Sequence, residues 1–284
     1  MLYSAYRIGI FLATHCPQKL VYILADIYAC VWYVFDNQRK NRARAHLQTL
    51  LQYNKKNCDT KELDSLTFGT FQNFSKYLFE VFRISLVDNG YVEKYIQHLD
   101  ASELDRAINE GKGVIIFTAH FGNWELAGVG MALLGYPTIV VALSHSDPRI
   151  NQLFLGLREK FGMSIIDLDK YAARECLRTL RNGKILALLG DEDFSDTHIE
   201  IEYLGEIIRV PRGAAALSRA AGTPVLPSLM VRQPDNRFVI HHEKAIYPVY
   251  SENQEEDIQK MTKEYMNALA PYFLKYPEQW FRFK

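Results

Sequence analysis

The chain has 284 residues, 48% hydrophobic and 23% charged, a composition that excludes an intrinsically disordered protein and allows a large buried core. Its 33 basic and 33 acidic residues cancel, so there is no basic surplus and no nucleic-acid partner is expected. The four cysteines form no C-x-x-C pair, which argues against a zinc site or a disulfide framework and favours a reducing compartment: Cys16, Cys30, Cys58 and Cys176.

The N-terminal segment concentrates positive charge, because residues 1–56 contain eight lysines and arginines against only two aspartates. Within it, residues 20–35 form the most apolar stretch of the chain, rich in aromatic side chains and followed by a basic run at residues 39–44. Sixteen residues are short of the roughly 20 that span a bilayer, so the pattern favours a helix lying in the lipid headgroup region. A buried core helix with a solvated basic end is the alternative. The start of the chain lacks the features of a signal peptide.

The chain after this segment changes from helical to alternating structure. Apolar residues between 63 and 81 recur at spacings typical of an amphipathic helix. From residue 112 onward, short β-branched runs alternate with helical stretches, and a last helix is expected over 255–273. The expected strands are 114–118, 138–143, 164–166, 185–189, 199–203, 225–231 and 238–242, and the expected helices between them are 123–134, 148–161, 171–181 and 211–221.

This alternation predicts an α/β fold, with a mixed, mostly parallel central sheet flanked by helices. We divide the chain into residues 1–56, an apolar and basic membrane-associating segment of helices, and residues 57–284, the α/β domain. Ligands of open α/β sheets bind beyond the carboxyl ends of the strands. The residues that follow the strands are therefore the candidates for a site.

The segment from His120 to Glu125 is the first candidate, because it follows the strand 114–118 directly. Gly122 permits a tight turn and Asn123 is a good N-cap, so Glu125 would lie in the first turn of the next helix. From there it could hold one imidazole nitrogen and leave the other to remove a proton, while backbone N–H groups face a developing oxyanion. The alternative is a structural histidine, since an H-x4-E spacing also arises by chance.

The whole chain resembles the lysophospholipid-acyltransferase-like superfamily and, within it, the lipid A biosynthesis acyltransferases (lauroyl and myristoyl transferases). The resemblance is carried by the H-x4-E segment and by several further blocks. These are Phe71-Gln72-Asn73-Phe74 with Glu80, Arg158 with Gly162, Asp191-Glu192-Asp193-Phe194, Tyr203-Leu204-Gly205, Val210-Pro211-Arg212-Gly213 and Pro277-Glu278-Gln279-Trp280.

The resemblance implies an acyltransferase on the cytoplasmic face of the bacterial inner membrane, peripheral or shallowly anchored. It would move a fatty acyl chain from an acyl-carrier-protein thioester, or acyl-CoA, to a hydroxyl of a lipid A precursor or related glycolipid. His120 would be the base and Glu125 its orienting carboxylate, with Arg158 and Asp191 as further required residues and no cofactor or metal. In the related mannolipid branch an acidic residue before the Y-L-G block assists the histidine, and Glu200 is the candidate.

Other polar groups leave alternatives open. Arg209 and Arg212 flank Pro211 at a helix start and form either a phosphate clamp or ordinary surface arginines. Asn123 and Asp193 are further candidates for substrate binding. Asp191 and Asp193 also read as the D-x-D of a metal-dependent nucleotide-sugar glycosyltransferase. A phosphoinositol-mannolipid acyltransferase is the alternative for the acceptor, and a non-enzymatic lipid-binding relative would have lost the histidine or the glutamate.

Overall fold

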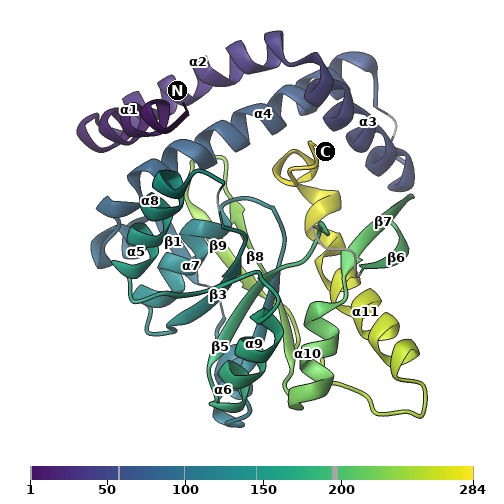
Figure 1. The fold of residues 1–284 in the computed structure, drawn as a ribbon. Helices are drawn as coiled ribbons and strands as arrows, with labels where there is room; N and C mark the ends of the chain where they lie inside the picture. The colour runs from purple at the N-terminus through teal and green to yellow at the C-terminus, as the bar shows by residue number, and fades with distance from the viewer. Residues whose placement is uncertain (1, 57, 99, 145, 194–197, 284) are drawn as a thin grey trace.

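The computed structural model describes residues 2–56, 58–98, 100–144, 146–193 and 198–283. It confirms the predicted α/β class: a seven-stranded sheet in the order β1-β9-β8-β2-β5-β3-β4, parallel except where β8 meets β9. Helices cover both faces of this sheet (Figure 1). The strands are β1 (Ile96–His98), β2 (Val114–Thr118), β3 (Thr138–Ala142), β4 (Ser164–Asp167), β5 (Ile185–Leu189), β8 (Val225–Arg232) and β9 (Phe238–His242).

The helices that flank the sheet pack on the two sets of side chains that alternate along each strand. These helices are α5 (Asn89–Tyr95), α6 (Ser102–Asn109), α7 (Trp124–Leu133), α8 (Pro148–Glu159), α9 (Ala172–Arg181), α10 (Gly213–Ala221) and α11 (Gln254–Lys275). In β2, Ile115 and Phe117 face the core beneath α9–α11, whereas Val114 and Ile116 face the core beneath α5–α7. Short 3₁₀ turns occur at Ile84–Leu86 and Pro277–Gln279.

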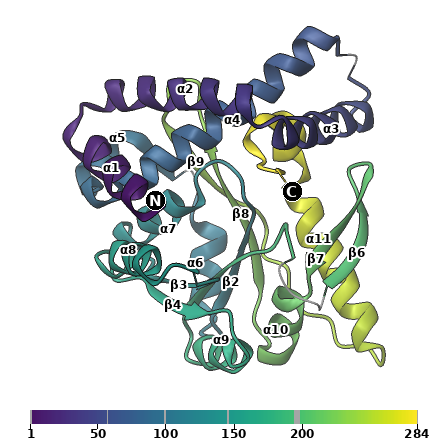
Figure 2. The same ribbon diagram turned by 45° about the horizontal axis from the view of Figure 1, so that its top comes forward.

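Four N-terminal helices form a separate layer across one end of the sheet (Figures 1 and 2). They are α1 (Leu2–His15), α2 (Gln18–Phe35), α3 (Asn37–Tyr53) and α4 (Thr60–Arg83). The small side chains of Val21, Ala25 and Ala29 are fully buried in this layer, and α2 makes its contacts chiefly with α4. Among the described residues, α2 is the single helix long and apolar enough to cross a membrane by length and composition.

On the side of this layer that faces away from the sheet, α1 and α2 expose large apolar side chains. Exposed apolar patches of this kind commonly mark sites of protein or membrane interaction. Phe35 is 81% exposed and Val34 62% exposed. We call this surface the outer face of α1–α2; its large apolar members are Ile8, Phe11, Leu12, Leu20, Ile23, Ile27, Tyr28, Val31, Val34 and Phe35.

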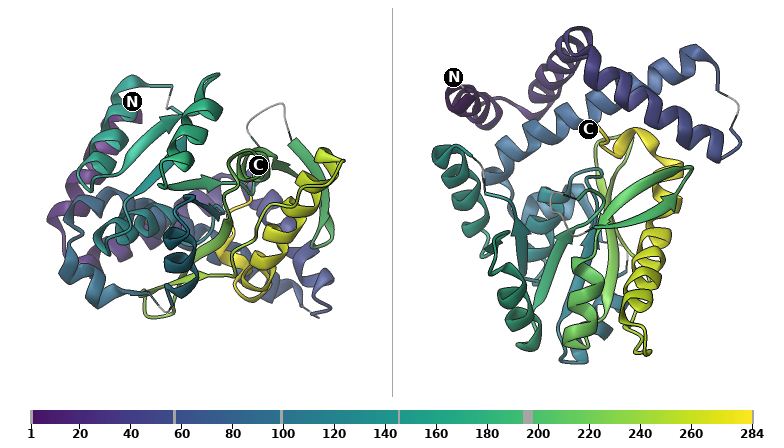
Figure 3. Two further views of the ribbon diagram at one scale, coloured as in Figure 1. Left: turned by 90° about the horizontal axis from the view of Figure 1, so that it is seen from below. Right: turned by 45° about the vertical axis from the view of Figure 1, so that its right-hand side comes forward.

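Three features differ from the sequence-based expectation. β1 lies ahead of residue 112, in the part of the chain that was expected to be helical. β6 (His198–Tyr203) pairs with an unexpected strand, β7 (Glu206–Pro211), in a two-stranded sheet beside α11 (Figure 3). Leu204 and Gly205, the turn between them, both have positive φ (50° and 87°), as a tight hairpin turn requires. Pro211 therefore ends a strand instead of starting a helix, and α10 begins at Gly213.

Candidate functional site

His120 and Asp191 meet because they follow two neighbouring parallel strands at the same distance. Thr118 of β2 is paired with Leu189 of β5, and each functional residue comes two positions later. The backbone N–H and the Nδ1 atom of His120 both contact Asp191 Oδ1, at 3.0 Å and 2.8 Å. Gly190 allows this approach, since a Cβ on it would lie 2.0 Å from the Phe117 ring.

The Asp191 carboxylate is fully buried and is satisfied on both oxygens. Its Oδ2 accepts a 2.8 Å hydrogen bond from the indole N–H of Trp280, and its backbone carbonyl accepts one from Arg282. Burial alone would raise the pKa of Asp191, but the His120 imidazole and the donated hydrogen bonds outweigh burial and hold this pKa at about 2. The carboxylate is therefore ionised at neutral pH and faces the imidazole as a fixed negative charge.

The C-terminal segment fixes the loop that carries His120. Phe121 and Trp280 form an antiparallel bridge, while the N–H of Phe281 donates to the His120 carbonyl at 2.9 Å. Gly122 adopts φ +58°, and a Cβ there would lie 1.9 Å from the Met230 carbonyl oxygen. Only glycine fits this turn, which explains its place in the H-x4-E segment.

Glu125 lies in the first turn of α7, as predicted, but its carboxylate is engaged by Arg158 of α8. The guanidinium binds both carboxylate oxygens, with Nη2–Oε1 at 2.5 Å and Nε–Oε2 at 3.2 Å. Burial disfavours the charged guanidinium, yet the carboxylate outweighs this effect and raises the pKa of Arg158. Glu125 was expected to hold one imidazole nitrogen of His120, but the carboxylate that contacts Nδ1 is Asp191.

Asn123 caps α7 as expected, but the structure does not place it at a substrate surface. It is fully buried, its Oδ1 accepts from the Leu126 N–H, and its Nδ2 donates to Glu80 at 2.8 Å. Glu80 also forms a buried, two-pronged ion pair with Arg232. The prediction that Asn123 binds substrate is therefore not supported: its side chain ties the His120 loop to α4 and β8.

The remaining predicted residues lie near the site to different degrees. Asp193 lines the inner cavity described below and pairs with His198 at 3.3 Å, and Arg212 lines the same cavity while it contacts Glu255. Glu200 and Arg209 pair with each other on the exposed face of the β6–β7 hairpin, outside both cavities. We therefore do not retain Glu200 as a residue that assists His120, or Arg209 as part of a phosphate clamp. Phe194, the aromatic residue of the D-x-D block, lies outside the described residues.

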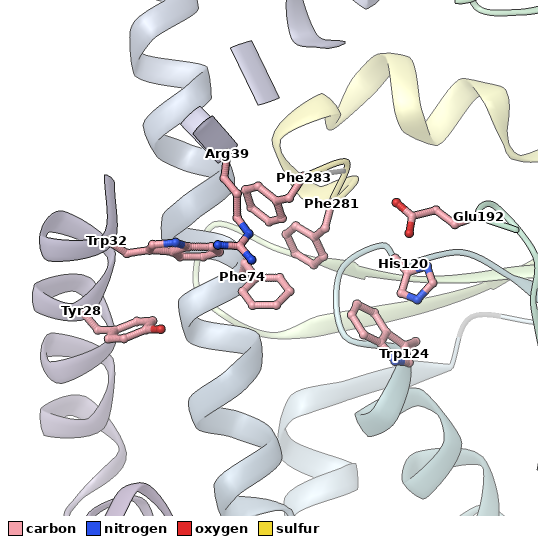
Figure 4. A pocket seen from close by; sticks show the side chains of 9 residues that line it. All are labelled: Tyr28, Trp32, Arg39, Phe74, His120, Trp124, Glu192, Phe281 and Phe283. Carbon is pink, nitrogen blue, oxygen red and sulfur yellow. The ribbon is translucent and has the colours of Figure 1, made fainter. Parts of the chain in front are cut away.

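Two cavities meet at His120 and share Trp124 and Glu192. The inner cavity, about 810 Å³, extends along the sheet between apolar side chains of β2, β3, β5, α7 and α9, with Glu125 and Arg158 on its wall. The outer cavity, about 400 Å³, lies between His120 and the N-terminal helices (Figure 4). It is lined by Tyr28, Trp32, Arg39, Phe74, His120, Trp124, Glu192, Phe281 and Phe283.

Sequence reasoning missed several residues of this arrangement. Trp124 stacks on Tyr77, with ring centroids 4.0 Å apart, and makes a T-shaped contact with the His120 ring, with centroids 5.1 Å apart. Trp280 was marked only as part of a C-terminal block, and its bond to Asp191 carries no local sequence signal. The aromatic run at residues 28–35 was assigned to the membrane, although Tyr28 and Trp32 line the outer cavity.

Comparison with known proteins identifies similar enzymes. The profile of the family described as bacterial lipid A biosynthesis acyltransferase matches residues 1–284. A phosphatidylinositol mannoside acyltransferase of Mycolicibacterium smegmatis is 22% identical over 220 residues, 76% of this chain and 70% of that protein. One of Mycobacterium tuberculosis is 25% identical over 170 residues, 58% of this chain and 54% of that protein. A lipid A biosynthesis acyltransferase of Haemophilus influenzae is 23% identical over 256 residues, 88% of this chain and 76% of that protein.

Proposed function

The chain belongs to the bacterial lipid A biosynthesis acyltransferase family and is an acyltransferase, and from this premise we propose its reaction. The enzyme transfers a fatty acyl chain from an acyl-carrier-protein thioester to a hydroxyl of a lipid A precursor or a related bacterial glycolipid. His120 is the general base. The observation that carries this proposal is the His120–Asp191 contact at 2.8 Å, at the junction of the two cavities.

Asp191 is the carboxylate that orients the base. A hydrogen bond from Nδ1–H of His120 to the ionised carboxylate selects the tautomer whose lone pair is on Nε2. A carboxylate in this position also stabilises the imidazolium that forms when the base takes a proton. The role first predicted for Glu125 is therefore given to Asp191, and Glu125 acts by holding Arg158 in the wall of the inner cavity.

The reaction needs no covalent enzyme intermediate. The acceptor hydroxyl oxygen attacks the thioester carbonyl carbon while its proton passes to Nε2 of His120. The tetrahedral intermediate then collapses, the carbon–sulfur bond breaks, and the proton goes from the imidazolium to the leaving thiolate. The products are an ester on the acceptor and a free thiol on the donor.

The inner cavity is the binding site for the acyl chain. Its volume, about 810 Å³, lies within the range of pockets that enclose small ligands. Its walls include Met131, Val140, Leu177 and Leu188, which offer an apolar chain a surface from which water is excluded. Arg158 lies on this wall, where its positive charge can stabilise the oxyanion of the tetrahedral intermediate.

The enzyme works at the cytoplasmic face of the inner membrane, with the outer face of α1–α2 buried in the lipid headgroup region. The support is the row of exposed apolar side chains on these helices. The basic residues of α3 follow directly and would lie beside anionic lipid.

A second candidate for the acceptor is a phosphoinositol mannolipid. The observation in its favour is the similarity to the two mycobacterial proteins named phosphatidylinositol mannoside acyltransferase. Nucleotide-sugar transfer is not retained, because the matching family is one of acyltransferases and both oxygens of Asp191 accept protein hydrogen bonds.

The proposed function is tested by incubating the purified enzyme in mixed vesicles with acyl-carrier-protein thioesters and, separately, a lipid A precursor or a phosphoinositol mannolipid. Mass spectrometry should detect one added acyl chain on one of these acceptors. His120→Ala should lower turnover by roughly 10²–10⁴. His241→Ala, on β9 and outside both cavities, should retain wild-type turnover. Wild-type turnover by His120→Ala would contradict the proposed base.

A further inference from the structure

We propose that the outer cavity binds the sugar headgroup of the acceptor and that Arg39 binds a phosphate carried by that headgroup. This inference rests on the proposed function and deepens it, because it assigns the acceptor a position and a charge. The acyl chain would then reach His120 from the inner cavity, while the acceptor hydroxyl would reach it from the outer cavity. The enzyme would select acceptors that carry a free hydroxyl and a phosphate on one headgroup.

Aromatic rings from four parts of the chain form the walls of the outer cavity (Figure 4). Trp32 of α2 lies with its ring centroid 5.4 Å from Phe74 of α4 and 5.0 Å from Phe283, and Phe74 lies 5.2 Å from Phe281. These contacts hold the rings in fixed positions. A pyranose ring has an apolar C–H face and a polar rim of hydroxyls, so it fits an aromatic wall with polar groups at its ends.

Arg39 and His120 occupy opposite ends of this cavity, with the phenylalanine rings between them (Figure 4). Glu192 lies at the His120 end, where a carboxylate can accept a hydrogen bond from a sugar hydroxyl. A headgroup that spans the cavity would therefore present a hydroxyl to the base and an anionic group to the guanidinium.

Asp36 builds the cationic end of the cavity. As the N-cap of α3, its Oδ1 accepts the Arg39 backbone N–H at 3.0 Å, and its Oδ2 accepts both the Arg39 Nη1–H and the Trp32 indole N–H. The Asp36 carboxylate thus orients both the Arg39 guanidinium and the Trp32 ring, which forms one wall of the cavity. Backbone and side-chain hydrogen bonds from Arg39 hold the pKa of Asp36 at about 2, so this support is ionised at neutral pH.

The guanidinium retains donors for a ligand. Arginine has five N–H donors in a planar fork that matches phosphate oxygens, and Asp36 takes one of them from the Arg39 side chain. Half of the Arg39 side chain is exposed (53%), so a ligand can reach it. The cavity also adjoins α2, and the acyl chains of a membrane-bound acceptor could remain in the lipid while its headgroup enters.

The test compares Arg39→Gln with the wild type on a phosphorylated lipid A precursor and on the same lipid after enzymatic removal of its phosphates. A phosphoinositol mannolipid is a third acceptor, to distinguish a phosphomonoester on sugar from a phosphodiester. With whichever phosphorylated acceptor is the substrate, Arg39→Gln should raise the KM for that acceptor by about tenfold or more, because a hydrogen bond to a charged group is lost. The kcat and the KM for the donor should stay unchanged. With the dephosphorylated lipid as acceptor, the wild type and Arg39→Gln should have the same acceptor KM, as high as that of Arg39→Gln with the phosphorylated lipid.

Arg44→Gln is the matched control, because it removes the same charge from the same helix while Arg44 pairs with Asp64 outside both cavities. At fixed vesicle charge and salt, it should change KM far less than Arg39→Gln does. An equal loss in Arg39→Gln and Arg44→Gln would indicate general membrane attraction and overturn the inference, as would a KM effect of Arg39→Gln that is independent of the acceptor phosphate.

A binding measurement separates this inference from the proposed function. Tryptophan fluorescence is titrated with glucosamine 1-phosphate and with glucosamine in the wild type, Arg39→Gln and Arg44→Gln. Tighter binding of the phosphorylated sugar, lost in Arg39→Gln alone, would support the subsite even if no acyl transfer were found. Equal binding of both sugars would contradict the inference while the transferase activity could still stand.

Discussion

Trp280 donates its indole N–H to Asp191 Oδ2 at 2.8 Å, on the carboxylate oxygen opposite the one that holds His120. The Trp280 ring is itself fixed, since it stacks on Phe273 with ring centroids 4.0 Å apart and makes a T-shaped contact with the buried His46 ring, with centroids 4.8 Å apart. The C-terminal segment therefore positions the Asp191 carboxylate and also pairs with the His120 loop. This relationship explains why residues at the end of the chain belong to the site.

Trp280→Phe should keep the ring stack on Phe273 and remove the N–H donor. A buried, ionised oxygen then lacks its partner, which costs about 1–3 kcal/mol of unfolding free energy. Turnover should fall because Asp191 can rotate away from His120. Chemical denaturation and the acyl-transfer assay measure the two effects.

Tyr272→Phe is the control for Trp280→Phe, since it deletes a hydrogen bond to Glu243 outside the cavities. It should leave turnover unchanged. Equal turnover by Trp280→Phe and the wild type would show that Asp191 does not depend on the indole.

Asp191→Asn should lower turnover by roughly 10²–10⁴, because a neutral amide no longer selects the required tautomer or stabilises the imidazolium. The acidic limb of the kcat/KM profile should also move to lower pH, since the charge that favours the protonated imidazole is absent. Asp257→Asn, at a hydrogen-bonded aspartate near the start of α11 that pairs with Arg219, is the control and should keep the wild-type profile. An unshifted acidic limb in Asp191→Asn would exclude the proposed pairing.

Glu125→Gln, Arg158→Gln and the double variant test whether Glu125 acts through Arg158 or directly on the base. If it acts through Arg158, the losses of turnover should not add, and the double variant should resemble the Arg158 single variant. Additive losses would instead support the first prediction, in which Glu125 orients His120. The same cycle at the exposed pair Asp147–Arg149 should give a coupling near zero in stability and turnover.

Most strands of the sheet, and the candidate site residues that follow them, could be predicted from the sequence because the signals for both are local. The periodicity change near residue 112 located β2 and β5, and the rule for the carboxyl edge of the sheet pointed to His120 and Asp191. By contrast, β1 was missed, and so was β7, which lies between the alternating strand β6 and an expected helix start at Pro211. Gly205 was the sequence signal for the hairpin turn, because glycine readily adopts the positive φ that this turn requires.

The partners of the charged residues could not be predicted, because they are far apart in sequence. Glu125 meets Arg158 across 33 positions, Asp191 meets Trp280 across 89, and Glu80 meets Arg232 across 152. The H-x4-E segment and its place at a strand end paired His120 with Glu125, the carboxylate nearest to it in sequence. The packing of α8 and the C-terminal segment decides which carboxylate reaches the imidazole.

Unfolding at low pH should report the ionisation of Asp191. Its pKa of about 2 in the folded enzyme is below the value of about 3.9 in an unfolded chain. The stabilisation is therefore present above pH of about 4 and is lost as the pH falls through about 2, with a size on the order of 2 kcal/mol. The difference in unfolding free energy between the wild type and Asp191→Asn, measured in urea from pH 6 to 2, should shrink over this interval. A constant difference would mean that folding does not lower the pKa of Asp191.

Membrane docking should depend on the outer face of α1–α2. Ile27 and Val34 are 55% and 62% exposed on α2, and a bilayer would bury them. Aspartate at either position should weaken binding to anionic vesicles about tenfold or more, because burial of such a side chain contributes about 1.5–3 kcal/mol. Circular dichroism and turnover on detergent-dispersed acceptor should remain close to the wild type.

Val249→Asp is the matched control for this surface, because Val249 is as exposed as Ile27 (55%) but lies in the segment between β9 and α11. This segment runs at the end of the sheet opposite the N-terminal layer (Figure 1). It should bind vesicles like the wild type in flotation or sedimentation assays. If Ile27→Asp and Val34→Asp bind as tightly as Val249→Asp, the outer face of α1–α2 does not enter lipid. The basic residues of α3 would then have to account for attachment, and high salt should release the enzyme.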